Sequence, residues 1–396
     1  MKGLLLFIKN NRIIYKASIV SIIILMFISV MQINPNNEKK TISGTISNAD
    51  YTICFDASTG KFSIDGKLES KVYDVDKIIK ELEISAYPGG VMGEGVNPAD
   101  YELIFSGVNF STTAPIALEI KNGDVNIWLM GKNNKISSSY SAEGNGFYGI
   151  TTTGKITFYS GTLEVNAYNS EETGNKDCAA IAAKNVNIQG ATVVANGHGC
   201  NGKGIYAESS ITIDSANVTA SGGKSAIAVG STGKCNVNGR VDASTTVDGE
   251  LSYIKDSEFN TQCMEYKHVK IEPKVISVDI TWGNMDFKYS ESDWNADSHD
   301  YNTKTWSNNT TDGDKITVAN AGNVPVTASI KYNQDSNYKG IKGTILQNKA
   351  SATQYTNDIT VTAKSSIDAY LSLNGSLSSS TTSKTTIGIV TVTISE

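Results

Sequence analysis

The chain has 396 residues, enough for two or three folded units, one of which could be an elongated array of repeats. Charged residues make up 19% of the chain and the formal net charge is −6, so there is no basic excess to neutralise a phosphate backbone, and nucleic acid is not expected as a partner. Abundant Gly, Ser, Thr, Asn and Val with only 6 prolines favour many short strands joined by tight turns.

The first feature along the chain is an apolar run over residues 17–33, which basic residues precede. Basic residues before an apolar run place the N-terminus in the cytoplasm. No small-residue cleavage pair follows the run before Asn34 and Pro35, so we expect an uncleaved signal anchor. This hydrophobic helix would hold the protein in the cell membrane with its body extracytoplasmic. A cleaved signal peptide, and therefore a secreted protein, is the alternative.

A short amphipathic helix is predicted over residues 74–83. Apolar residues lie at positions i, i+3, i+4 and i+7 of this stretch, and Asp74 or Asp76 can cap its first turn. We interpret this helix as part of a cap that covers the N-terminal end of the repeats described next.

Four copies of one pattern follow, at residues 149–167, 180–196, 204–221 and 226–244. Their leading isoleucines, Ile150, Ile181, Ile205 and Ile227, are separated by 31, 24 and 22 residues. Each copy continues with an apolar pair at period two, a turn of small residues, and a further alternating pair. Period two indicates strands with one buried face.

One such copy cannot bury its own inward residues, whereas stacked copies build a continuous apolar column. The sequence therefore predicts an all-β protein whose main part is a right-handed parallel β-helix. The stretch around Ile116 and residues 124–137 is interpreted as an atypical earlier coil. Terminal repeats are usually atypical in such arrays.

The pattern changes near Glu272 and Pro273. Alternating strands with turn-rich separators and no fixed period then run to the end of the sequence, which is typical of an antiparallel, Ig-like β-sandwich. The predicted organisation is an anchor and linker over residues 1–40, a β-helix with its cap over 41–272, and a sandwich over 273–396.

The repeats resemble those of Gram-positive bacterial surface proteins that are described as carbohydrate-binding. The residues that carry this resemblance are ITIDSANVTASG and VNIQGATVVANG, and DVNIWLMGKNNKI is similar to the opening coil of that group. The likeness covers roughly residues 100–245, and the C-terminal segment also looks like a sandwich domain common on such secreted proteins. The resemblance implies the β-helix fold and, less specifically, a glycan as the partner.

Catalytic residues are not identified by the sequence. Gly197, His198 and Gly199 match a fragment of the motif set of pectin-hydrolysing β-helix enzymes, with Asp177 on the preceding copy, but the rest of that set is absent. An inverting hydrolase needs two carboxylates, and a lyase needs an acidic calcium cluster and a strong base. Arg240, one of only two arginines, lies in a turn without an aligned row of aspartates. We therefore predict a protein that is not an enzyme.

No metal site or cofactor site is predicted either. Asp293, Asn295 and Asp297 have the oxygen spacing that begins a calcium loop, but Ser298 and Lys304 replace its turn glycine and closing glutamate. His268 and His299 lack partners at the spacing of zinc ligands. The 5 cysteines, with no CxxC spacing, are expected to be mostly buried, with one bridge allowed. They are Cys54, Cys178, Cys200, Cys235 and Cys263.

Sugar binding usually needs an exposed aromatic ring with amide and carboxylate groups beside it. The aromatic candidates on the repeats are Trp128, Tyr148, Tyr159, Tyr168 and Tyr206. The leading hypothesis is a non-catalytic surface module that presents one face of the β-helix to a polysaccharide or cell-surface glycan. The alternatives are a structural stalk or adhesin that makes protein contacts and, less favoured, a divergent polysaccharide lyase or hydrolase.

Overall fold

The computed structural model describes residues 45–66, 73–88, 101–131, 133–140, 146–169, 178–199, 201–350, 352–355, 358–377 and 383–396. The predicted anchor at 17–33, Asp177 and Cys200 lie outside these ranges. The protein is all-β, as predicted, with several sheets and only short helices. Among the described residues, no helix is both long enough and apolar enough to span a membrane.

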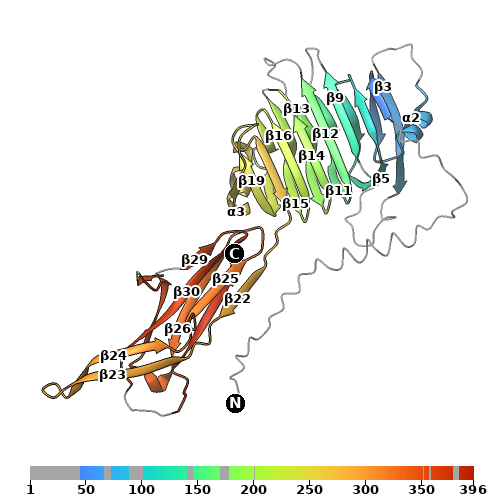
Figure 1. The fold of residues 1–396 in the computed structure, drawn as a ribbon. Coiled ribbons are helices and arrows are strands. Elements are labelled where there is room, and N and C mark those ends of the chain that lie inside the picture. Colours follow the sequence, from blue (N-terminus) through green and yellow to red (C-terminus); the bar gives the residue numbers. More distant parts are fainter. Residues whose placement is uncertain are drawn as a thin grey trace, which may run out of the picture. The chain divides into compact units, whose positions relative to one another are not determined.

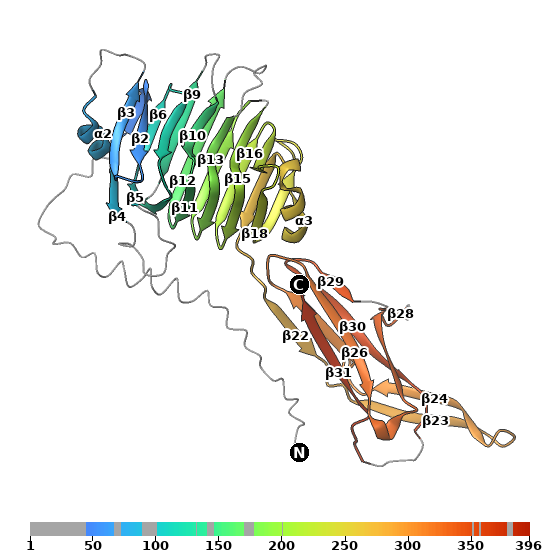
Figure 2. The ribbon, with the colours of Figure 1, turned by 180° about the vertical axis from the view of Figure 1, so that it is seen from behind.

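Two large sheets contain the strands between residues 45 and 272. The 9-stranded sheet has the order β1 (Thr45–Ala49), β6 (Asn109–Thr112), β9 (Asn134–Tyr140), β12 (Thr162–Asn169), β14 (Thr192–Gly197), β16 (Asn217–Gly222), β21 (His268–Glu272), β19 (Arg240–Ser244) and β20 (Ser252–Ile254). Figures 1 and 2 show these strands stacked side by side, with the colours running from blue to yellow along the stack.

The 12-stranded sheet lies beside the first. Its path is β3 (Lys61–Gly66), β2 (Tyr51–Asp56), β7 (Ile116–Lys121), β10 (Phe147–Thr152), β13 (Cys178–Gln189), β11 (Lys155–Tyr159), β8 (Val125–Met130), β5 (Tyr101–Ser106) and β4 (Ile84–Pro88), with β15 (Gly202–Asp214), β17 (Ser225–Val229) and β18 (Lys234–Asn238) branching from it. The long strands β13 and β15 each pair with one strand through their first half and with another through their second half. We refer to the two sheets together as the stack.

Neighbouring copies of the repeat pair in parallel and in the predicted register. Ile181 lies opposite Ile150 on one side and Ile205 on the other, and Ile205 lies opposite Ile227. All four isoleucines are fully buried. The apolar pair that follows each isoleucine stacks in the same register in all four copies, and the further alternating pair does so in the first three. The atypical earlier coil joins them through the pairing of Leu118 with Ile150. The predicted pairing of successive copies is therefore confirmed, except at the last alternating pair of the fourth copy.

Tight corners separate the strands of each copy. Ser160, Gly161, Gly190 and Ser215 all have left-handed backbone conformations, with φ between 49° and 64°. Glycine is required at 161, because a Cβ there would lie 2.0 Å from the carbonyl oxygen of Leu129 on the preceding copy. The small residues between the alternating pairs thus allow the chain to turn close to its neighbour.

The N-terminal end of the stack carries the predicted helix, α2 (Val75–Glu81). Of the two candidate caps it is Asp74 that accepts a hydrogen bond from the backbone N–H of Lys77, at 3.0 Å. Ile79 and Leu82 are buried against the apolar core of the stack. This prediction is confirmed, and strands β1 to β3 add further structure at the same end that the repeat pattern did not indicate.

The C-terminal end of the stack departs from the predicted pattern. The sequence predicted that Val241 and Ala243 would stack in parallel on Val218 and Ala220. Instead, β21 lies between β16 and β19 and pairs antiparallel with both. Helix α3 (Asp256–Gln262) and the 3-10 turn η1 (Cys263–Glu265) precede β21. The prediction for the last pair was wrong, because the chain folds back and inserts a strand that lies outside the repeat period.

The residues after 272 form smaller sheets in which every pairing is antiparallel. They are a 5-stranded sheet of β22 (Val278–Trp282), β25 (Lys315–Asn320), β30 (Ser365–Asn374), β27 (Lys342–Asn348) and β28 (Thr353–Gln354), a 3-stranded sheet of β29 (Ile359–Val361), β26 (Val326–Gln334) and β31 (Gly388–Ser395), and the hairpin β23 (Phe287–Asn295) with β24 (Asp300–Asn308). The 3-10 turn η2 (Ser336–Tyr338) follows β26. The 5-stranded and 3-stranded sheets share one apolar core. Alternating burial along β25 and β26 fits sheets with one buried face each.

Candidate functional site

The outward face of β9, β12, β14 and β16 is the best candidate for a binding surface, and we call it the lateral face. On β12 the residues Leu163, Val165 and Ala167 are fully buried in the stack. Successive side chains of a strand point to opposite sides, so Glu164, Asn166 and Tyr168 point outward. The pattern that builds the core therefore also places these polar and aromatic groups on one surface.

A row of hydrogen-bonded polar side chains crosses the lateral face. Ser137, Asn166, Asn196 and Ser221 lie at matching register positions on the four strands. The Nδ2 of Asn196 donates to Oδ1 of Asn166 at 2.9 Å, and the hydroxyl of Ser221 donates to Oδ1 of Asn196 at 2.8 Å. The Nδ2 of Asn166 donates to the hydroxyl of Ser137 at 3.4 Å. We call this row the amide ladder; these bonds fix the orientation of each amide, which lowers the entropy cost of binding a ligand there.

A carboxylate lies beside the ladder. Glu164 forms an ion pair with Lys135 at 2.7 Å between Nζ and Oε1, and the same oxygen accepts from Nδ2 of Asn166 at 2.8 Å. The hydrogen bond from Lys135, followed by the one from Asn166, lowers the pKa of Glu164 below its ordinary value. The carboxylate is therefore ionised at neutral pH and acts as a hydrogen-bond acceptor.

Tyr168 supplies an exposed ring at the end of the same strand. Its exposed fraction is 49%, and its ring centroid lies 5.6 Å from that of His198, with 55° between the ring planes. The backbone holds His198 in place, because its N–H donates to the carbonyl of Ala167 and its own carbonyl accepts from the Cys178 thiol. The structure thus places His198 beside an aromatic ring, while Asp177, which the sequence analysis noted on the preceding copy, lies outside the described residues.

The lateral face can therefore offer a sugar an apolar ring and several oriented donors and acceptors. At its two register neighbours Glu164 faces Lys135 and Val194, so no second carboxylate stands next to it on the adjacent strands. Acid and base catalysis of glycoside hydrolysis needs two carboxyl groups across the scissile bond. Glu164 and its two register neighbours do not form a carboxyl pair of this kind.

The other aromatic candidates are less accessible. The rings of Trp128 and Tyr159 stack at 4.6 Å, in register on β8 and β11 of the 12-stranded sheet. Burial, followed by the charge of Glu102, raises the pKa of Tyr159. Tyr148 and Tyr206 are half-buried, and the Lys203 ammonium lies 4.6 Å from the centre of the Tyr206 ring. The outward row next to Trp128 and Tyr159 is itself almost inaccessible, and it consists of Glu102, Asn126 and Thr157.

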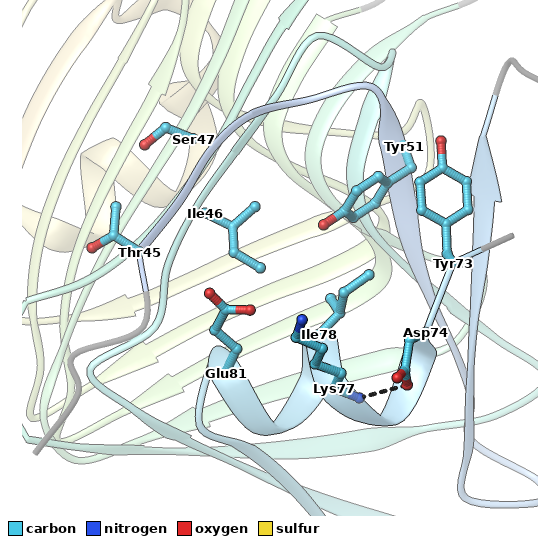
Figure 3. A pocket seen from close by; sticks show the side chains of 9 residues that line it. All are labelled: Thr45, Ile46, Ser47, Tyr51, Tyr73, Asp74, Lys77, Ile78 and Glu81. Carbon is cyan, nitrogen blue, oxygen red and sulfur yellow. Dashed lines mark hydrogen bonds between the residues drawn. The ribbon is translucent and has the colours of Figure 1, made fainter. Parts of the chain in front are cut away.

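A cavity of about 500 Å³ opens near the N-terminal end of the stack, between β1, β2 and α2 (Figure 3). The rings of Tyr51 and Tyr73 lie side by side at its edge, 4.8 Å apart. Tyr51 also packs on Phe110. Burial is the main cause that raises the pKa of Tyr51, and the charge of Glu81 is the second cause. Tyr73 donates to Asp50. Because these groups already serve packing and capping, the cavity is a weaker candidate than the lateral face.

The segment whose oxygen spacing matches the beginning of a calcium loop lies in the β23–β24 hairpin. The Oδ1 of Asn295 accepts from the backbone N–H groups of Asp297 and Ser298, so this oxygen closes the turn. Lys304, at the position of a closing glutamate, forms an ion pair with Asp300. In the part of the chain that the structure describes, no group of three His, Cys, Asp or Glu side chains is placed to hold a metal ion.

The same hairpin carries an exposed aromatic pair that sequence reasoning missed. Trp294 and Tyr301 face each other across β23 and β24, with ring centroids 5.0 Å apart and exposed fractions of 56% and 37%. The hairpin extends away from the other C-terminal strands (Figure 1). Two aromatics flanking a polar turn are a signal that the sequence does contain, but the segment of Asp293, Asn295 and Asp297 was considered only as a possible calcium loop and interpreted as a loop between strands.

The remaining candidates have structural roles. Arg240 forms two hydrogen bonds with the carboxylate of Asp242, each 2.7 Å long, and the pairing raises the pKa of the guanidinium. His268 lies on β21 opposite Ser221 and Ser244, and His299 lies in the β23–β24 turn with a left-handed backbone. The four described cysteines are all buried, as predicted.

Comparison with known proteins finds no family model, no curated protein and no solved structure that matches this chain.

Proposed function

We propose that the protein is a non-catalytic carbohydrate-binding module on the outside of a cell, and that its lateral face is the binding surface. In this proposal the stack is a right-handed parallel β-helix, the region after 272 is an Ig-like sandwich, and the segment 17–33 anchors the chain in the membrane. The partner is a polysaccharide or cell-surface glycan.

The half-exposed ring of Tyr168 next to the amide ladder carries this proposal. A sugar ring presents C–H groups on one side and hydroxyl groups at its edge. An exposed aromatic ring can stack on the C–H groups of the sugar. The oriented amides of Asn166 and Asn196 and the carboxylate of Glu164 can form hydrogen bonds with its hydroxyl groups. Strands in a parallel sheet lie about 4.8 Å apart, so the ladder extends across several strands and suits an extended chain of sugars.

The test is a binding experiment with the full chain on a glycan array and on insoluble polysaccharides. We expect saturable binding to one class of glycan. Replacing Tyr168→Ala should weaken that binding about tenfold, because a central aromatic contact is typically worth more than 1 kcal/mol. Tyr168→Phe should retain most of it, since the ring remains. Asn196→Ala should weaken binding less.

The matched control is Tyr301→Ala, which removes an exposed tyrosine from the C-terminal hairpin. This variant should bind glycan as the wild type does. Unchanged affinity of Tyr168→Ala would contradict the proposal.

A second candidate function is an adhesin or stalk that makes protein contacts through the hairpin. The observation that favours it is the Trp294–Tyr301 pair, since exposed aromatic residues are enriched at protein interfaces. An absence of glycan binding, together with capture of a cell-surface protein that Trp294→Ala abolishes and Tyr168→Ala leaves intact, would favour this function over the first.

A further inference from the structure

Two buried thiols meet at the C-terminal end of the stack. Cys235 lies on β18 and is 5% exposed, and Cys263 begins η1 and is 3% exposed. Both belong to the apolar core of the stack. They come from different elements, separated along the chain by β19, β20 and α3.

The packing of α3 brings the two thiols to the same place. The side chain of Asn260 accepts from the backbone N–H of Val237 at 2.8 Å and donates to the carbonyl of Val237 at 3.2 Å. The amide thus bonds β18 where a further strand would otherwise pair. Cys235 is two residues before Val237 on the same side of the strand, and Cys263 directly follows α3. The contact of α3 with β18 therefore places both cysteines in the same part of the core.

Their hydrogen bond is consistent with this geometry. The side chain of Cys263 bonds that of Cys235, which together with burial raises the pKa of Cys235. The same bond lowers the pKa of Cys263.

The other described cysteines have different surroundings. The thiol of Cys54 contacts the carboxylate of Glu119 at 3.6 Å, and that of Cys178 contacts the backbone carbonyls of Ala167 and His198. Burial raises the pKa of each thiol to about 11. Both are equally buried but face no second described thiol, which makes them internal controls.

We infer that Cys235 and Cys263 form a disulfide bond that fastens α3 and η1 to the last parallel strand of the stack. The oxidant is a disulfide, either a small molecule or an oxidoreductase. The Cys263 thiolate attacks one sulfur of the oxidant and releases its other sulfur as a thiol. The Cys235 thiolate then attacks the Cys263 sulfur and releases the second thiol. Two protein thiols are oxidised and one disulfide is reduced to two thiols, so the exchange is balanced.

Peptide mapping tests the bond. The full chain is reduced, unfolded and refolded in a buffer of oxidised and reduced glutathione, so that burial does not limit access of the oxidant. It is then unfolded, its remaining thiols are alkylated, and it is digested with trypsin. We expect peptides 235–240 and 256–267 to appear as one cross-linked species that reductant separates. The peptides with Cys54 and Cys178, residues 41–61 and 177–184, should be alkylated at those cysteines.

Thermal unfolding gives a second readout. The bond closes a loop of about 30 residues, so reducing it should lower the unfolding midpoint of the stack by roughly 5–10 °C. Cys54→Ser should keep this dependence on reductant, and Cys263→Ser should lose it. Full alkylation of both Cys235 and Cys263 after refolding in the oxidising buffer would overturn the inference. Neither result depends on glycan binding.

Discussion

The stack and the C-terminal sheets are both built from short strands, but the strands pair according to different rules. In the stack, Ile181 pairs with the equivalent residue of the copy before it and of the copy after it. In the C-terminal region, Val318 pairs antiparallel with Ile280 on one side and Ile367 on the other, residues that share no repeat. Register in the stack can therefore be read from sequence period, whereas register in the C-terminal sheets depends on contacts that the sequence does not mark.

Both regions also contain a fully buried asparagine that bonds backbone groups. In the stack, Asn134 accepts from the N–H groups of Gly107 and Val108 and donates to the carbonyls of Met130 and Thr162. In the C-terminal region, Asn320 donates to the carbonyls of Val324, Val361 and Thr362 and accepts from the N–H of Gly322. Each amide satisfies backbone groups at turns that no strand pairs. In both regions a buried asparagine side chain thus provides hydrogen bonds to backbone groups at turns that would otherwise lack a partner.

The largest expected effect comes from the core of the stack. Phe158 is fully buried between Ile127 and Ile188, so Phe158→Ala should lower the free energy of unfolding of the stack by about 3–5 kcal/mol. The two regions have separate cores, so the C-terminal region should unfold as before. Denaturant unfolding followed by circular dichroism measures the free energy of unfolding of the stack.

The unfolding of the C-terminal region needs a reporter that responds to this region alone. Of the 4 tryptophans, Trp128 lies in the stack and the others follow residue 272. In a Trp128→Phe background, fluorescence therefore reports the C-terminal sheets, and its transition should not move with Phe158→Ala. A common shift of both transitions would show that the two regions unfold as one cooperative unit.

An intermediate effect is expected from the buried amides. Asn134→Ala and Asn320→Ala each leave several backbone groups without their partner, and each should cost about 2–4 kcal/mol. With the same two reporters, Asn134→Ala should move the circular dichroism transition of the stack and Asn320→Ala the fluorescence transition. Asn196→Ala, which replaces a partly exposed amide of the ladder, is the control and should cost less than either. Equal losses of unfolding free energy in all three variants would contradict the expectation that the buried amides contribute more to stability than the partly exposed one.

The smallest effect concerns the ion pair on the lateral face. The folded-state pKa of Glu164 is lowered, so its contribution to stability is present above the ordinary pKa of a glutamate and is lost as the pH falls through the lowered pKa. Because both side chains are about half exposed, solvent screening keeps this contribution below about 1 kcal/mol. Glu164→Gln should reduce the difference in unfolding free energy between pH 7 and pH 3 by that amount, measured in low salt. A larger pH-dependence in the variant would be the contrary result.

The sequence predicted much of the stack for a physical reason. Buried residues at Ile150, Ile181 and Ile205 recur because each must pack on its own equivalent, and that constraint is visible as a period. The helix after Asp74 was equally visible, because its apolar spacing and its cap are local features. The insertion of β21 was not visible, because an antiparallel strand of alternating residues has the same appearance wherever it pairs. The C-terminal partners were hidden for the same reason.

The candidate site was predicted only in part. Tyr168 was one of five aromatic candidates, and nothing local distinguishes its exposed ring from the stacked ring of Tyr159 on the preceding strand. The amide ladder was missed because outward polar residues are common in any half-buried strand. A signal was present, since Asn166, Asn196 and Ser221 each follow the same inward residue of their copy. Polar residues that recur at one outward position of a repeat indicate a continuous row.

The insertion of β21 also limits how the protein can grow. A parallel stack with an open last strand would present unpaired N–H and C=O groups to which another molecule could add end to end. Here β21 reverses direction on one sheet, and the Asn260 amide occupies the backbone groups of Val237 on the other. The parallel pattern of the stack is therefore interrupted at this end, and we expect end-to-end addition of another copy to be disfavoured there. Length can still change by gain or loss of whole repeats in the interior, where each new copy finds the same neighbours and both ends stay as they are.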